Sequence, residues 1–342
     1  MKRIWKMLLA AVAGAMLCTG CTGMEVHSDI DKTAEDMGRS EGDDLIVVGF
    51  SQVGAESDWR NANTEAFKSA LTEEEGFYLI YEDAQQKQEN QIKALRNFIL
   101  QEVDYIILNP IVETGWDSVL QEAKDAGIPV IISDRRVKVE DDSLYVCWLG
   151  SDFEQEGIHA GEWLNTYLEE QNRENETINI VTLQGTLGST AQLGRTTGFA
   201  SVMSEHKNWK MMDMREGDFT QAKGQEVMKD FLEQYPDIDV VVCENDNMAF
   251  GAIDAMREAG RSFGTNGDII VISFDAVKEA LQRIIAGEIN VVFECNPLSG
   301  PKIAELIRKL ENGEKIAKEN YIEETYFDSS MKLERILPTR AY

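Results

Sequence analysis

A carboxylate and a guanidinium stand side by side where one apolar run of the chain ends. The run VIIS at 130–133 is followed directly by Asp134 and Arg135. A carboxylate accepts hydrogen bonds from two hydroxyl groups, and a guanidinium donates through a planar fork. The two side chains together suit vicinal hydroxyls on a sugar ring. A structural ion pair at a strand end is the alternative that these residues leave open.

Other polar residues follow apolar runs in the same way. Asn245 and Asp246 follow one run, and Asp275 ends another. We expect Asn245 and Asp275 to contact a ligand, because the first side chain past a strand points toward the crevice of such a sheet. Asp246 is expected to cap the helix that follows. Arg195, in a loop-to-helix region of the second half, could donate from the opposite wall.

Two aromatic residues occupy polar loops. Trp59 lies in ESDWR, and Phe219 lies in EGDFT. An aromatic face packs well against the C–H face of a sugar and loses little freedom on binding. We therefore predict both as ligand contacts, with packing in the core as the alternative for each.

Six short apolar runs must position these residues. Near-continuous Val, Ile and Leu indicates strands covered on both faces, as in a parallel sheet. In open parallel sheets, ligands bind in the crevice beyond the carboxyl ends of the strands. The runs span 46–52, 105–110, 130–135, 179–185, 240–246 and 269–275.

Helical stretches alternate with the runs, which predicts right-handed βαβ units. Both halves begin with an apolar strand, a Gly-containing polar loop and a helix. We predict an α/β fold of two similar doubly wound parallel-sheet domains, joined by a multi-strand hinge, with the ligand cleft between them. The N-terminal lobe is expected to comprise 45–149 plus 296–322, and the C-terminal lobe 150–295 plus 323–342. The helices are expected at 59–71, 88–101, 116–126, 154–170, 191–204, 220–234, 248–259 and 276–286.

The first residues of the chain predict export. Residues 1–20 combine three basic residues with an apolar stretch that is short for a membrane span, which is typical of a signal peptide. Small residues before Cys21 resemble a lipoprotein signal, with a plain cleaved signal as the alternative. Residues 21–44 are acidic and poor in large apolar groups, so we expect a solvated tether. The protein is predicted to be extracytoplasmic and lipid-anchored to the outer face of the cell membrane.

The composition narrows the classes of function. The net charge is −28, and it becomes −31 without residues 1–20, so nucleic acid and anionic membrane surfaces are unfavourable partners. Three histidines and no CxxC spacing give zinc or histidine chemistry little to use. Cys147, Cys243 and Cys295 lie in apolar runs and are expected to be free and buried, with a Cys147–Cys295 bridge as the alternative. The Gly-containing loops match no phosphate-binding motif.

Paired carboxylates could also serve a glycosidase. Abundant Asp and Glu make chance pairing easy, however, so we predict a binding protein without enzymatic activity, cofactor or metal.

At these residues the chain resembles the ribose/galactose-type periplasmic sugar-binding proteins, the type I substrate-binding proteins of ABC importers. The resemblance covers about residues 45–335. It rests on the segments GFSQ, DAQQKQENQIKAL, SDR, GDFTQAKGQEVM, ENDNMAFGAIDAMREAG and ISFDA. Within the family the chain looks most like the galactofuranose-binding branch, through VGFSQVGAESDWR, QQKQENQIKALRNF and LQGTLGST.

The resemblance implies a set of ligand-binding residues. Glu56 and Arg60 replace the Asn and second aromatic residue of ribose binders, which argues against ribose. Glu294 stands where many relatives have a glutamine, which implies a different hydroxyl pattern. The full set implied is Gln52, Glu56, Trp59, Arg60, Asp134, Arg135, Arg195, Phe219, Asn245, Asp275 and Glu294.

The resemblance also implies a function. A monosaccharide, galactofuranose-like or a related aldose, would bind between the lobes as they close about the hinge. The monomeric protein would then deliver the sugar to the membrane permease of an ABC importer. A ligand-sensing receptor module of the same fold, coupled to a membrane kinase or chemoreceptor, is the alternative.

Overall fold

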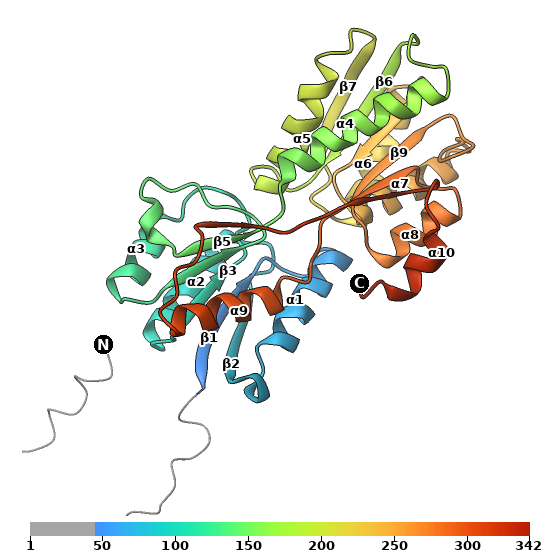
Figure 1. Cartoon of the computed structure of the whole chain (residues 1–342). Helices are drawn as coiled ribbons and strands as arrows, with labels where there is room; N and C mark the ends of the chain where they lie inside the picture. The colour runs from blue at the N-terminus through green and yellow to red at the C-terminus, as the bar shows by residue number, and fades with distance from the viewer. Residues whose placement is uncertain (1–44) are drawn as a thin grey trace, which may run out of the picture. The chain divides into compact units, whose positions relative to one another are not determined.

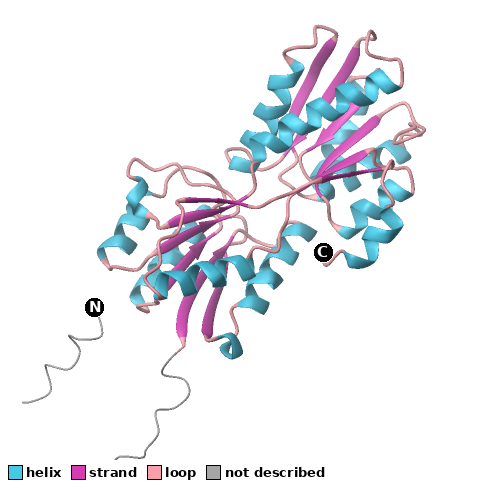
Figure 2. Cartoon of the chain, viewed as in Figure 1, coloured by secondary structure: helices cyan, strands magenta, loops and turns pink. Residues whose placement is uncertain are grey.

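The apolar runs pair into two six-stranded sheets in the computed structural model, which describes residues 45–342. The predictions for the signal peptide at 1–20, for lipid-bearing Cys21 and for the tether at 21–44 concern residues outside that range. Each sheet has helices on both faces (Figure 2). The predicted fold class, two α/β domains built on parallel sheets, is confirmed. No helix within 45–342 is both long enough and apolar enough to cross a membrane.

The first sheet has the strand order β11-β5-β4-β3-β1-β2, and every neighbouring pair is parallel. Its strands are β1 (Ile46–Gln52), β2 (Phe77–Asp83), β3 (Tyr105–Leu108), β4 (Val130–Ser133), β5 (Cys147–Gly150) and β11 (Glu319–Tyr321). Its helices are α1 (Asp58–Ala70), α2 (Gln88–Leu100), α3 (Asp117–Asp125) and α9 (Gly300–Glu311).

Successive residues of a strand face opposite sides of a sheet, so strands covered on both sides are apolar throughout. In β3, Ile107 packs in one buried cluster with residues of α1 and α9. Its neighbours Ile106 and Leu108 pack in another cluster with residues of α2 and α3. All three side chains are fully buried, which explains the unbroken apolar run.

The second sheet has the order β12-β10-β9-β8-β6-β7. Its pairs are parallel except β10 and β12, which run antiparallel. The strands are β6 (Ile178–Gln184), β7 (Trp209–Glu216), β8 (Val240–Cys243), β9 (Ile270–Asp275), β10 (Val291–Glu294) and β12 (Tyr326–Asp328). The helices are α4 (Phe153–Glu170), α5 (Thr190–Met203), α6 (Gln221–Gln234), α7 (Asp246–Glu258), α8 (Lys278–Ile285) and α10 (Leu333–Ile336).

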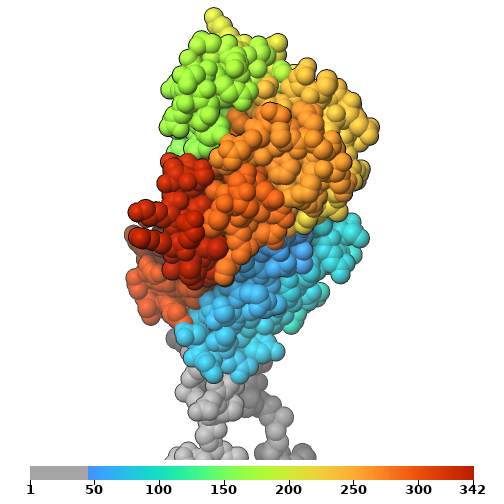
Figure 3. All heavy atoms as spheres, turned by 90° about the vertical axis from the view of Figure 1, so that its right-hand side faces the viewer, coloured from blue at the N-terminus to red at the C-terminus, as the bar shows by residue number. Residues whose placement is uncertain are grey.

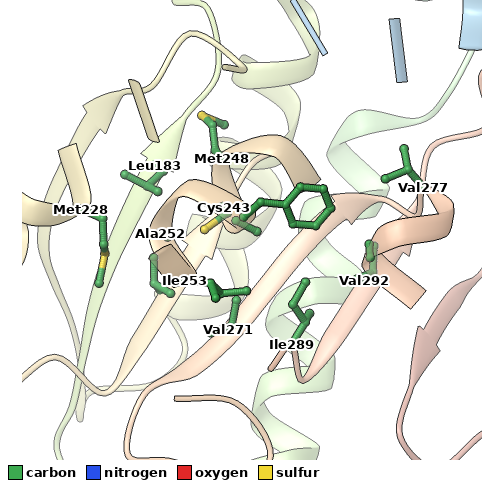
Figure 4. Packing of buried hydrophobic residues seen from close by; sticks show 14 of the residues in the cluster. Leu183, Met228, Cys243, Met248, Ala252, Ile253, Val271, Val277, Ile289 and Val292 are labelled. Atoms are coloured by element: carbon green, nitrogen blue, oxygen red, sulfur yellow. The ribbon is translucent and has the colours of Figure 1, made fainter. Parts of the chain in front are cut away.

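The largest buried cluster lies on one face of the second sheet. Leu183, Val271 and Val292 of the strands meet Met228 of α6 and Ile253 of α7 there (Figure 4). Each of these side chains is at least nine-tenths buried, and such burial contributes about 1.5–3 kcal/mol per large apolar side chain. The opposite face is covered by α4 and α5, with Phe199 among the buried residues.

The chain passes between the two sheets three times (Figure 1). The first passage, at residues 151–152, joins β5 to α4, and the second, at 295–299, joins β10 to α9. The third, at 322–325, joins β11 to β12. All three leave the carboxyl end of a parallel strand, so they lie beside the crevice where such sheets bind ligands.

Candidate functional site

A partly open cavity lies between the carboxyl ends of the two sheets. Nine of the eleven residues predicted to bind a ligand line it, and both sheets contribute to them. The complete lining is Glu56, Ser57, Trp59, Arg60, Asp134, Arg135, Phe153, Ala191, Arg195, Phe219, Asn245, Asp275 and Cys295.

Unusual backbone conformations aim three of these side chains. Asp134 directly follows β4 with φ 61°, Asp275 ends β9 with φ 105°, and Phe219 precedes α6 with φ 58°. Positive φ is rare for residues other than glycine and costs of order 1–3 kcal/mol, so it persists where the surrounding structure imposes it. Such residues concentrate at binding sites, which supports the assignment of this cavity.

Arg60 organises the wall formed by the first sheet. Its Nε donates to Oε1 of Glu56 at 2.9 Å, and its Nη1 donates to Oδ2 of Asp134 at 2.8 Å. Gln52 accepts a further bond from Nη1 at 3.2 Å. Oε2 of Glu56 is buried and has no hydrogen-bond partner among the described residues. A buried oxygen without a donor costs about 1–3 kcal/mol, so this atom favours a ligand that supplies one.

Arg135 is held less firmly than Arg60. Its Nη1 donates to the carbonyl of Ile111 at 2.9 Å, and its Nη2 lies 3.9 Å from Oε1 of Glu56. Burial, together with the nearby charge of Arg60, lowers the pKa of Arg135 to about 10. Burial acts to raise the pKa of Glu56, but Arg60 and Arg135 outweigh it and hold that pKa below its ordinary value.

Arg195 organises the wall formed by the second sheet. Its Nε donates to Oε2 of Glu156 at 2.7 Å, and its Nη2 lies 3.4 Å from Oδ1 of Asp275. Its Nη1 donates to the backbone carbonyl of Glu244. Burial raises the pKa of Glu156 to about 7 against the opposing charge of Arg195. The carboxyl groups of Glu156 and Asp275 therefore share one guanidinium. Burial likewise raises the pKa of Asp275.

The two predicted aromatic residues both reach the cavity. Nε1 of Trp59 donates to the carbonyl of Cys295 at 2.6 Å, and its ring packs in the large cluster of the second sheet. The ring of Phe219 lies directly on Gly185, where an added Cβ would come within 1.9 Å of Cζ. Cζ of Arg135 lies 5.0 Å from the centroid of the Phe219 ring. Each ring therefore meets residues of the opposite lobe.

Direct hydrogen bonds join the two lobes around the cavity. The backbone N–H of Asp58 donates to Oδ1 of Asn247, and Nδ2 of Asn247 donates to Oδ2 of Asp58, both at 3.0 Å. Elsewhere the N–H of Arg136 donates to Oγ1 of Thr190 at 2.9 Å. In the space-filling view, the blue residues of the first lobe lie directly against orange and yellow residues of the second (Figure 3).

Two predicted residues lie outside the cavity lining. Gln52 is buried behind it, where its side chain contacts Arg60 and Asn63. Oε1 of Glu294 accepts from Arg340 at 2.6 Å and from Tyr342 at 2.8 Å, so its charge is already paired. Ligand contact by these two residues therefore has no support from the geometry.

The capping role expected for Asp246 needs correction, whereas Asn245 lines the cavity as expected. Oδ1 of Asn245, not the carboxylate of Asp246, caps α7 by accepting from the N–H of Met248 at 2.9 Å. Asp246 is the first residue of that helix and accepts from Ser273 at 2.6 Å and from the N–H of Val277 at 2.8 Å. Nδ2 of Asn245 donates to the carbonyl of Phe219 at 3.0 Å, so this residue positions an aromatic ring of the cavity.

Four lining residues were not predicted: Ser57, Phe153, Ala191 and Cys295. Phe153 begins α4 immediately after the first passage between sheets, and Cys295 begins the second passage. Their positions next to the passages are the feature from which their place in the cavity could have been predicted. Cys147, Cys243 and Cys295 are free and buried, as expected, so the alternative bridge is not formed.

Comparison with known proteins identifies the class to which this fold and cavity belong. Residues 48–315 match the family model described as a periplasmic binding protein domain. The chain belongs to the periplasmic binding protein family, which confirms the resemblance and implies a location outside the cytoplasm.

Three similar proteins illustrate the relationship. The galactofuranose-binding protein YtfQ of Escherichia coli strain K12 is 42% identical over 272 residues, covering 78% of this chain and 83% of that protein. A Mycobacterium smegmatis protein in complex with β-D-fucofuranose has a TM-score of 0.82 and 43% identity, covering 86% of this chain and 94% of that one. The binding component of the arabinose ABC transporter of Shewanella sp. ANA-3, bound to α- and β-L-arabinofuranose, has a TM-score of 0.80 and 41% identity, covering 86% and 95%. These homologues are solute-binding proteins, not enzymes.

Proposed function

We propose that this chain binds a monosaccharide in the cavity between its lobes, as the extracytoplasmic solute-binding protein of an ABC sugar importer. The observation that carries the proposal is the cavity itself, in which guanidinium and carboxylate groups alternate on two facing walls.

The polar groups suit a neutral ligand rich in hydroxyl groups. A hydroxyl both donates and accepts, so one sugar can satisfy the unpartnered oxygen of Glu56 and the loosely held fork of Arg135 together. The rings of Trp59 and Phe219 offer apolar faces for the C–H side of the sugar. Three named relatives bind galactofuranose, fucofuranose and arabinofuranose, so we propose a five-membered furanose ring, galactofuranose-like or of a related aldose.

Binding is proposed to proceed by closure of the two lobes about the three passages. A ligand shifts such an equilibrium only through its higher affinity for the closed form. Contacts that join the two lobes stabilise the closed form. The Asp58–Asn247 pair and the bond from Trp59 to Cys295 are two such contacts beside the cavity. We propose that residues 45–149 plus 296–322 and residues 150–295 plus 323–342 move as the two units.

Anchoring and delivery complete the proposal. Cys21 would carry the lipid anchor at the outer face of the cell membrane, and residues 21–44 would serve as the tether. The monomeric closed complex would dock on the permease subunits and release the sugar unchanged.

Mass spectrometry of native protein tests the sugar assignment, because a ligand held between two lobes often remains bound through purification. We expect one bound pentose or hexose, lost after unfolding and refolding, and a rise in Tm when the matching sugar is restored. A crystal structure of that complex then gives the ring form. If no monosaccharide copurifies and none raises Tm, the sugar assignment fails while the family assignment stands.

A further inference from the structure

One carboxyl group joins all three passages between the lobes. Glu324 lies on the third passage, and its Oε1 accepts from Oγ of Ser151 on the first passage at 2.7 Å. The same oxygen accepts from the backbone N–H of Asn296 on the second passage at 2.7 Å. Any rotation of the lobes about these passages must therefore change the surroundings of Glu324.

A second carboxyl group lies next to it. Glu156 is 5% exposed, and its Oε2 is bound to Arg195 of the cavity. Its Oε1 is buried and has no hydrogen-bond partner among residues 45–342. A side-chain oxygen of Glu156, one of Glu324 and the Sγ of Cys295 lie within 4.8 Å of one another. Two carboxylates this close cannot both be ionised without strong repulsion.

A single proton on this pair would remove the repulsion between the two carboxylates and would give Oε1 of Glu156 a hydrogen-bond donor. A protonated carboxyl at Glu324 could donate to the bare oxygen of Glu156 while its other oxygen keeps both bonds to the passages. We propose that Glu156 and Glu324 hold one proton between them in the closed protein, and that this proton links the sugar cavity to the hinge. The proposal rests on the proposed function, because the link runs through Arg195, which lines the cavity.

The charges around the pair favour retention of the proton. Arg195 acts on both carboxyl groups, and it is shared with Asp275. The acidic groups that face the pair from the neighbouring elements are Asp134, Asp152 and Asp275. Glu294 and His159 line an adjoining pocket that also contacts Glu156 and Glu324, through which the pair can exchange protons with solvent. The charge of Glu294 is balanced by Arg340 at 2.6 Å.

The direction of the pKa values agrees with this geometry. Burial, and then the neighbouring Glu156, raise the pKa of Glu324 to about 9. Burial raises the pKa of Glu156 to about 7. Because both values lie above the ordinary value of 4.5, the folded protein retains a proton that the unfolded chain releases. The stability linked to this proton is complete below about pH 4.5 and is lost as pH rises through about 7 to 9.

The test compares Glu324→Gln with the wild type. Glutamine keeps an oxygen for Ser151 and Asn296 and supplies a permanent N–H donor toward Glu156. Exposed Glu323 on the same passage provides the matched control, Glu323→Gln. Two quantities are measured from about pH 6 to about pH 10: Tm of the sugar-free protein, and Kd for the sugar identified by mass spectrometry.

In the wild type and in Glu323→Gln, we expect Tm to fall as pH rises toward about 9 and to level off above it. Affinity should fall by up to about tenfold per pH unit over the range in which the closed form holds the proton and the open form has released it. In Glu324→Gln both dependences should be largely removed. Calorimetry in buffers of different ionisation enthalpy should detect proton uptake when the wild type binds sugar. It should detect none when Glu324→Gln binds sugar.

Three results would overturn the proposal. The first is a Kd and a Tm whose pH dependences are the same in the wild type and Glu324→Gln. The second is a Tm increase on adding Ca²⁺ or Zn²⁺ that Glu324→Gln abolishes, since a cation rather than a proton would then separate the carboxylates. The third is the expected pH dependence of Tm together with a Kd that does not change with pH. The proton would then have no effect on the sugar cavity. If no sugar binds at any pH, the proposed function fails, and the Tm comparison still decides whether the pair holds a proton.

Discussion

Three arginines line the cavity, and they differ in how far the protein already satisfies them. Arg60 is bound to Glu56 and Asp134, and Arg195 is bound to Glu156 and near Asp275. Arg135 instead donates to one backbone carbonyl and lies 3.9 Å from a carboxylate. Removing one partner of a buried ion pair costs about 3–5 kcal/mol of stability. A loss of affinity in a variant of Arg60 or Arg195 therefore could not be separated from a loss of stability. Arg135 is the cleaner probe of ligand contact.

Arg135→Ala is predicted to weaken sugar binding by about 1.5–3 kcal/mol, the range for a hydrogen bond to a charged group. Stability without sugar should change little or rise, because burial and Arg60 disfavour the charge of Arg135 and lower its pKa. Titration calorimetry and thermal unfolding measure the two effects. Arg96→Ala, at an exposed ion pair with Glu122, is the control. A loss of stability with unchanged affinity would assign Arg135 a structural role.

Glu56→Gln is predicted to flatten the acid side of the stability profile. Burial opposes its charge, yet Arg60 and Arg135 hold the pKa of Glu56 below its ordinary value of 4.5. Its contribution is therefore present above about pH 4.5 and lost as pH falls through the lower, folded-state pKa. Unfolding of both proteins between about pH 6 and about pH 3 should show a smaller fall in Tm for the variant. Parallel profiles would mean that the pKa of Glu56 is the same in the folded protein and in the unfolded chain.

At the scale of elements, the six predicted apolar runs correspond to β1, β3, β4, β6, β8 and β9, whereas the equally buried β5 and β10 were not among them. The burial of Ile106, Ile107 and Leu108 explains why such strands are recognisable as unbroken apolar runs. The edge strand β7 was not predicted, because its residues alternate between buried or partly buried and exposed. An edge strand with one exposed face alternates apolar and polar residues. Over so few residues this alternation is hard to distinguish from the pattern of an amphipathic helix.

The site could be predicted as far as strand ends define it. Asp134, Arg135 and Asp275 follow directly from the ends of β4 and β9. The side chain that faces the cavity next to β10 could not be predicted, because one residue of register moves a side chain to the other face of a strand. Cys295 lines the cavity there, and its neighbour Glu294 turns to Arg340.

A glycine positions one of the aromatic rings. Gly185 follows β6, and a Cβ at this position would lie 1.9 Å from Cζ of Phe219. Gly185→Ala is predicted to displace the ring and weaken sugar binding by about 0.5–1.5 kcal/mol, the typical value of an aromatic contact. If the glycine acts through the ring, the variant should add little to the loss caused by Phe219→Ala. Additive losses in calorimetry would contradict that coupling.

At the scale of the whole molecule, closure has its own contacts apart from those to a ligand. Asp58 and Asn247 exchange two hydrogen bonds of 3.0 Å across the lobes. Neither Asp58 nor Asn247 lines the cavity, so the pair contributes to the closed form whichever sugar is bound. Its effect on affinity acts through the population of that form.

Asn247→Ala is predicted to weaken every sugar ligand by the same factor. Two lost hydrogen bonds correspond to about 1–2 kcal/mol, or about five- to thirtyfold in Kd, with the change mainly in the dissociation rate. Stopped-flow binding of two different sugars measures both factors, and Asn97→Ala on the exposed side of α2 is the control. Unequal losses for the two sugars would indicate that Asn247 affects ligand selection rather than closure.

We propose above that the cavity between the lobes binds a furanose sugar through groups on both walls. Calorimetric titration of sugar-free, refolded protein with D-galactose, D-fucose and L-arabinose tests it most directly, using the wild type, Arg135→Ala and Arg96→Ala. We expect one site per chain for at least one of these sugars, with binding weakened about tenfold or more by Arg135→Ala and unchanged by Arg96→Ala. Absence of binding by all three sugars, or binding that Arg135→Ala leaves unchanged, would contradict it.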